Sequence, residues 1–437
     1  MNWFHFTTMK HCIPKVFTFA GFKANLIKAI QSVFGLHLTN FDDSEVIVIL
    51  KRFESICVSF NILPNGFDQD QSITPSKWTK AKSILYSSLM TVNIVHLLFL
   101  SVFDSPEHLS IILGDFFYGH PSRRYVWIYW TILLIFGEVL RHYWIYLYRN
   151  GKSFSFRWHK GYKPEALFMS KFYCHKYSFI ASTLANLWIR AILLFGIGLG
   201  PVLIIIVQLV SQLPKTPQQF IFTYSWLLID YFGIFCTLAN LILTGAIITI
   251  DLSYFFLRCA HVTQALQNFV DEKMCLQRSN FLPYYETIIQ DIIVFLNQTE
   301  SRNHKVRNWM IFMYLGISFS ADFGFYTAAI VHIDHGSLDF VTIAISALSI
   351  FTIGISSYVS GIMLAMMQSC YKNNMKVAKY LPSNVNSFIK FADLQSRLSR
   401  TDIAFTVGSI LDMTKWLFVI YLIENAGLVM MFIINVK

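Results

Sequence analysis

The sequence predicts an all-α membrane protein with seven transmembrane helices, its N-terminus in the cytoplasm and its C-terminus outside. Charged residues make up only 14% of the chain and apolar residues 55%, including 41 Phe. A soluble domain has roughly a quarter of its residues charged. Seven long apolar stretches and the uneven placement of basic residues between them complete the case, so we expect a multi-pass protein of the cell membrane surrounded by lipid.

Each of the seven stretches is long enough to cross a hydrocarbon core of ~30 Å at about 1.5 Å per residue. The second is the most polar because it contains Glu138, Arg141 and His142. The third contains Pro201, which is expected to kink the helix or to end its regular part. The predicted spans are residues 82–103, 125–148, 180–210, 221–250, 309–332, 339–367 and 415–434.

The Lys and Arg residues between the spans predict the orientation. The N-terminal segment through Lys82 holds nine of them. The second, fourth and sixth loops hold seven, six and six, which makes 28 on one side of the membrane. The first, third and fifth loops and the C-terminus hold two, one, none and one, which makes 4. Basic residues concentrate on the cytoplasmic side of membrane proteins. We therefore interpret the net charge of +10 as the excess of basic residues in the cytoplasmic segments. The sequence has no basic stretch interleaved with aromatics of the kind that would indicate nucleic-acid binding.

Two of the cytoplasmic segments are long and have helical periodicity. Residues 1–81 form a cytoplasmic or interfacial region, and residues 82–367 contain spans one to six with a cytoplasmic helical extension at about 251–308. Residues 368–414 are predicted to be cytoplasmic anchor helices. The apolar positions that repeat at three- and four-residue steps are Ile288, Ile289, Ile292, Ile293 and Leu296, and Phe388, Phe391, Leu394 and Leu398.

The sequence lacks the motifs of the common enzyme classes. It has no P-loop, no H-E-x-x-H and no G-x-S-x-G. His332, Asp334, His335 and Asp339 cluster in a predicted outer loop, but we interpret them as a solvated connection and predict no metal and no cofactor. A secondary transporter or another multi-pass membrane protein remains the alternative; a transporter would be expected to have paired interrupted helices in two related halves.

Ionisable residues inside the spans are candidates for functional sites. Glu138, Arg141 and Arg190 are expected to form structural pairs. Asp230 and Asp322 lie at middle to outer depth with no basic residue in their own spans, which favours a ligand pocket. The predicted pocket residues, gathered at similar depth, are Trp130, Trp226, Asp230, Asp322, Tyr326, Thr342 and Ser346.

A block of five hydrophobic residues, 428–432, lies close to the C-terminus. Its composition and its distance from that end resemble the last helix of the insect gustatory and odorant receptor superfamily, although the Thr, Tyr and Gln of the family motif are replaced. The segment 405–408 with Leu411, Asp412 and Leu417 is similar to the family's approach to helix seven, as Ile62-Leu63-Pro64 is to its N-terminal region. Three residues follow the last span, and the short outer loop at about 211–220 favours a gustatory-type receptor.

The resemblance implies a chemosensory channel. The expected assembly is a homotetramer, or a heterotetramer with related subunits, that forms a non-selective cation channel opened by a small organic tastant. Residues 415–437 would then contain the pore-lining helix. The positions that the resemblance and helical spacing assign to the pore and gate are Ile423, Gly427, Met430, Ile433 and Ile434.

Overall fold

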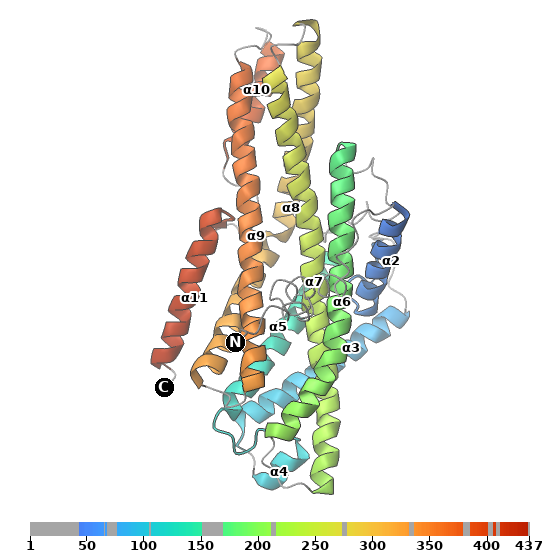
Figure 1. Ribbon diagram of the computed structural model, residues 1–437, viewed down its shortest axis with the longest axis vertical. Helices are drawn as coiled ribbons and strands as arrows, with labels where there is room; N and C mark the ends of the chain where they lie inside the picture. The colour runs from blue at the N-terminus through green and yellow to red at the C-terminus, as the bar shows by residue number, and fades with distance from the viewer. Residues whose placement is uncertain are drawn as a thin grey trace, which may run out of the picture.

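The chain is built almost entirely of helices in a computed structural model (Figure 1). The longest helices run side by side along the long axis of the molecule, and α3 crosses them obliquely. The described residues are 43–64, 66–67, 77–104, 106–150, 169–210, 216–272, 278–331, 336–378, 385–400, 405–407 and 411–435.

The helices follow the predicted spans in order. In the described part of the chain they are α2 (Asp43–Ser59), α3 (Lys77–Val102), α4 (Glu107–Ile112), α5 (Arg123–Arg149), α6 (Lys171–Val210), α7 (Pro217–Glu272), α8 (Arg278–Tyr326), the π-helix η4 (Thr327–Val331), α9 (Gly336–Val377), α10 (Val385–Leu398) and α11 (Lys415–Asn435). Two short strands, β1 (Thr406–Val407) and β2 (Leu411–Asp412), pair antiparallel before α11.

Five of these helices, namely α3, α6, α7, α8 and α9, are long and apolar enough to cross a membrane. The second and seventh predicted spans are the helices α5 and α11, but α5 carries Glu138 and Arg141, and the apolar stretch of α11 is the shorter Val419–Met431. An all-α membrane protein is therefore confirmed, whereas seven crossings and their orientation stay predictions. The helix α6 continues through Pro201, as membrane helices do where their surroundings satisfy the freed backbone groups.

The far end of α7, α8 and α9 forms a bundle with α10, away from α4 (Figure 1). The segments predicted as helices at 288–296 and 388–398 lie in α8 and α10, and Ile292, Leu394 and Leu398 are buried. An ion pair also joins α7 and α8, with Arg302 Nη2 3.0 Å from Asp251 Oδ2.

One part of the predicted anchor differs from the expectation of helices throughout 368–414. The segment before α11 forms the hairpin of β1 and β2, which docks on α8. The Thr406 amide and its hydroxyl both donate to Asn303 Oδ1, at 3.0 and 3.1 Å. Strands of two residues are too short to show a periodicity in sequence.

Candidate functional site

A small cavity lies between α3, α5, α6 and α7. It is at the end of the molecule where Figure 1 shows α4. Its space is about 440 Å³ including its mouth, but only about 30 Å³ is wide enough for the centre of a water molecule. Pockets for organic ligands commonly measure ~300–1,000 Å³, so the walls must move apart before such a ligand fits. The described lining residues are Leu97, Phe116, Phe117, Trp127, Trp130, Leu203, Leu227, Asp230 and Ile234.

Asp230 is the carboxylate of this cavity and faces a histidine of α3. Its Oδ1 atom lies 3.4 Å from Nδ1 of His96. The other ring nitrogen of His96, Nε2, lies 2.8 Å from the carbonyl oxygen of Leu113. The ring stacks on Trp226 with centroids 3.8 Å apart, and Trp226 Nε1 donates to the carbonyl of Ile112 at 3.1 Å. Trp226 is therefore not one of the described residues that line the cavity, and its hydrogen bond attaches the end of α4 to α7.

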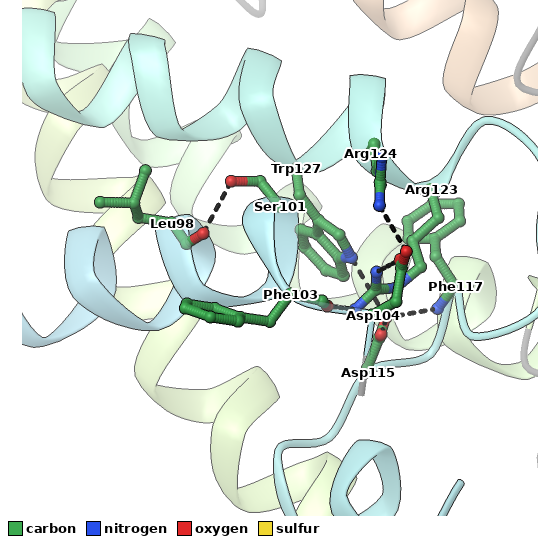
Figure 2. Close-up of polar contacts among 9 residues, drawn as sticks. All are labelled: Leu98, Ser101, Phe103, Asp104, Asp115, Phe117, Arg123, Arg124 and Trp127. Carbon is green, nitrogen blue, oxygen red and sulfur yellow. Dashed lines mark hydrogen bonds and ion pairs between the residues drawn. The ribbon is translucent and has the colours of Figure 1, made fainter. Parts of the chain in front are cut away.

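The loop between α4 and α5 is organised by one buried carboxylate, Asp115 (Figure 2). It accepts from Arg123 Nε at 2.5 Å, from Trp127 Nε1 at 3.1 Å and from the Phe117 amide at 3.3 Å. Burial raises the pKa of Asp115, although Arg123 and these bonds act in the opposite direction. Because Phe117 and Trp127 both line the cavity, this network fixes one wall of it.

Arg123 also ties this loop to the end of α3. Its Nη2 donates to the Phe103 carbonyl at 3.1 Å, and its Nη1 pairs with Asp104 at 3.4 Å. Asp104 pairs in addition with Arg124 (Figure 2). The loop between α4 and α5, which contributes Phe116 and Phe117 to the cavity wall, is thus attached to the end of α3 and to the start of α5.

The remaining predicted pocket residues form a second group around α8 and α9. Asp322 is 0% exposed, and neither carboxylate oxygen has a hydrogen-bond partner among the described residues. Tyr326 packs its ring against Tyr125 of α5, with centroids 6.2 Å apart. Thr342 and Ser346 are buried on α9.

A glycine permits the close approach of three helices within this second group. A methyl group on Gly324 of α8 would overlap Ser346 of α9 and the ring of Tyr129 of α5. Tyr129 is also the link to the cavity, because its ring packs edge-on against Trp130 at 5.7 Å. The predicted pocket residues therefore divide between the cavity, with Trp130 and Asp230, and a tightly packed neighbouring region.

The helix α11 has one buried face and one exposed face. Tyr421 and Asn425 are buried against the rest of the chain. Ser318 of α8 donates to Asn425 Oδ1 at 2.6 Å, and Asn425 Nδ2 donates to the Tyr421 carbonyl at 2.5 Å. The ring of Tyr421 packs edge-on against Tyr314 of α8 at 5.7 Å.

The predicted pore residues lie mostly on the exposed face of α11. Ile423, Met430 and Ile434 are 67%, 65% and 74% exposed. Gly427 is exposed as well, and no atom lies within 4 Å of a methyl group placed on it. Ile433 differs from these four residues, since it is half-buried and packs against the cluster around the cavity.

The ion pair predicted inside the second span is confirmed. Arg141 donates to both carboxylate oxygens of Glu138, at 2.6 and 2.9 Å, and also to Ser87 of α3 at 2.7 Å. Arg190, the third member of the expected group, instead contacts Asn186 of its own helix, with Nε 3.4 Å from Oδ1. In the described residues no three His, Cys, Asp or Glu side chains gather as a metal site. His332, Asp334 and His335 lie outside the described residues.

Sequence reasoning missed His96 and Tyr129 as neighbours of the pocket residues. His96 is a single histidine in an apolar helix and has no pattern around it. Tyr129 adjoins Trp130, and two neighbouring aromatics at a helix end are usual at membrane interfaces whatever their function. The bond of Asn425 to Ser318 had one available signal, namely a polar amide in the middle of an apolar helix.

Comparison of the sequence with protein-family models and with curated proteins gives no match. Comparison of the fold with solved structures does. The chain is similar to the insect olfactory receptor OR5 from Machilis hrabei, with a TM-score of 0.60, 11% identity, and coverage of 89% of this chain and 97% of that one. The structure of OR5 in complex with eugenol matches with a TM-score of 0.58, 11% identity, and coverage of 88% and 96%. The chain therefore has the fold of an insect olfactory receptor.

Proposed function

We propose that this chain is a subunit of a chemosensory, gustatory-type receptor that works as a tetrameric, ligand-gated, non-selective cation channel in the cell membrane. The fold supports the proposal because it covers nearly the whole of OR5, an olfactory receptor solved with eugenol. The observation that carries it is the two-sided character of α11, which has one face bound to its own chain and an apolar face left open.

The open face of α11 fits a pore wall better than a lipid contact. A membrane helix whose open face only contacts lipid would not need a hydrogen bond to a neighbouring helix to fix its rotation. Yet α11 is attached to α8 by the hydrogen bond between Ser318 and Asn425, so its orientation is fixed. Four copies of α11 facing an axis would bring together rings of Met430 and Ile434 side chains. Hydrophobic constrictions of this kind close a channel by excluding water.

We place the ligand pocket in the cavity between α3, α5, α6 and α7, which we call the outer cavity because the predicted topology puts it on the outer side, and in the second group beside it. Aromatic and aliphatic side chains with a few fixed polar groups are typical of sites for small organic molecules. Asp230 and Asp322 are the buried carboxylates of the two regions. The contact of Tyr129 with Trp130 joins these regions, and α8 continues from Asp322 to the bond with α11.

The direct test is electrical. The chain is expressed alone in cells without related receptors, its presence at the surface is verified, and currents are recorded during application of a panel of tastants and odorants. We expect an inward cation current carried by both Na⁺ and K⁺. As the control, Gly427→Trp places a bulky side chain on the open face of α11 and is expected to abolish the current at equal surface level. A surface-expressed chain that passes no current with any ligand, alone or with related subunits, would contradict the proposal.

A further inference from the structure

We propose that the outer cavity binds the head group of a primary ammonium ion, with Asp230 as its counter-ion and an aromatic wall around it. The inference deepens the proposed function, because it rests on this cavity being the ligand site and names the ligand class. It predicts that small protonated amines bind better than neutral molecules of the same shape.

The first argument is the composition of the wall. Four of the lining residues are aromatic, namely Phe116, Phe117, Trp127 and Trp130. Cations are attracted to the faces of aromatic rings, most strongly to Trp. The rings of Phe116, Phe117 and Trp127 pack edge-on or tilted against one another, and Trp127 is held by its bond to Asp115. The aromatic residues of the wall are therefore already held against one another, and they must move apart when a ligand enters.

The second argument is the state of Asp230. It is the one ionisable side chain among the residues that line the cavity, it is 6% exposed, and its Oδ1 atom has no hydrogen-bond partner among the described residues. A buried carboxylate is costly unless it is paired with a charge or a donor. An ammonium group supplies both a charge and three N–H donors.

The contact with His96 leaves the Oδ1 atom of Asp230 available to a ligand. A carbonyl oxygen can only accept, so the contact of His96 Nε2 with the Leu113 carbonyl requires the proton to be on Nε2. The other ring nitrogen, Nδ1, lies 3.4 Å from Asp230 Oδ1, but neither of these two atoms has a hydrogen-bond partner among the described residues. A ligand ammonium would supply the donor that Asp230 Oδ1 lacks. The charged groups next to the wall, Asp115 and Arg123, are already paired with each other at 2.5 Å.

The third argument is size. The centre of a water-sized group can move over only about 30 Å³ in this cavity. A primary ammonium head is about as large as a water molecule, whereas a quaternary ammonium is several times larger. The narrow space therefore favours an amine with a single substituent whose hydrocarbon part separates the aromatic walls.

Binding to the purified full-length chain tests the inference without requiring a current. The probes are 3-methylbutylamine, which is protonated at neutral pH, and 3-methylbutanol, which has the same carbon skeleton and no charge. Equilibrium titration followed by tryptophan fluorescence gives the two dissociation constants. In the parent protein we expect the amine to bind about ten-fold more tightly than the alcohol, as a charge-assisted hydrogen bond is roughly twice as strong as a neutral one.

The variant Asp230→Asn should reduce this ratio to about one while leaving the affinity for the alcohol within about three-fold. Asp271→Asn, an exposed carboxylate on the same helix α7, is the matched control and should keep the ratio. If Asp230→Asn fails to fold, Trp130→Leu provides the second variant, and it should weaken amine binding more than alcohol binding.

Equal affinities for the two probes in the parent protein would overturn the inference, and so would an unchanged ratio in Asp230→Asn. Either result would make the carboxylate a structural partner of His96. These outcomes are separate from a failure of the proposed function, which would appear as absent current in a protein that still discriminates between the two probes.

Discussion

The hydrogen bond between Ser318 of α8 and Asn425 of α11 is expected to stabilise the closed channel. The outer cavity is too narrow for an organic ligand in this conformation, so we expect the bond seen here to belong to the closed channel. Ser318→Ala removes the donor and leaves the buried Asn425 Oδ1 without it. Inside membranes such bonds contribute about 0.6 kcal/mol each, and up to ~1.7 kcal/mol.

The effect is multiplied in the proposed tetramer. Four lost bonds at about 0.6 kcal/mol each change the free-energy difference between closed and open states by roughly 2.4 kcal/mol, which is about 60-fold in the open-to-closed ratio. The expected result is a higher current without ligand and a lower half-maximal ligand concentration. The measurement is whole-cell current at matched surface expression, repeated for Asn425→Ala and for the double variant.

Because both single variants break the same bond, their effects should not add in the double variant. Ser356→Ala is the control, since in the described part of the chain Ser356 Oγ donates within its own helix, to the Thr352 carbonyl at 2.9 Å. Additive effects of Ser318→Ala and Asn425→Ala, or a current unchanged from the parent in both, would refute the reasoning.

Three further predictions follow from other parts of the chain. Met430→Ala and Ile434→Ala should each raise the ligand-independent conductance, because a smaller hydrophobic ring admits water. Leu428→Ala is the control, since Leu428 lies three residues after the buried Asn425 and seven after the buried Tyr421, away from the proposed pore face. An unchanged leak in both variants and in their double would remove Met430 and Ile434 from the gate. Arg302→Gln leaves Asp251 buried without its partner and should destabilise the protein by ~3–5 kcal/mol in a thermal unfolding assay, whereas Lys390→Gln at an exposed pair should have little effect. An epitope tag at the C-terminus should be accessible to antibody on intact cells and one at the N-terminus should not; the reverse pattern would overturn the predicted orientation.

The helices were predictable from sequence because each depends on a local property. Lipid-length apolar runs identify the spans, and the spacing of Glu138 and Arg141 predicted their pair because residues three apart share a helix face. Pro201 was expected to kink its helix or to end its regular part, and α6 does not end there. The hairpin before α11 was missed because its strands have two residues each.

The arrangement of the site was less predictable, because it depends on how helix faces meet. Asp230 and Asp322 looked equivalent in sequence, each a lone carboxylate four residues from an aromatic. In the structure Asp230 faces His96 of α3 and the cavity, whereas Asp322 lies fully buried in a different part of the bundle. Which neighbours they meet is decided by packing between segments far apart in the chain, for instance by the close approach at Gly324, and no local periodicity records it.

The double attachment of the last helix to α8 has a mechanical consequence. The hairpin leading into α11 is bound at Asn303, and the middle of α11 is bound at Ser318. These two anchor points are fifteen residues apart on one continuous helix, or about 22 Å at 1.5 Å per residue. Because both points are on α8, α11 cannot rotate about one of them without breaking the contact at the other. We therefore expect a rotation of α8 to move the start and the middle of α11 together, so that Ile423, Met430 and Ile434 turn as one rigid face.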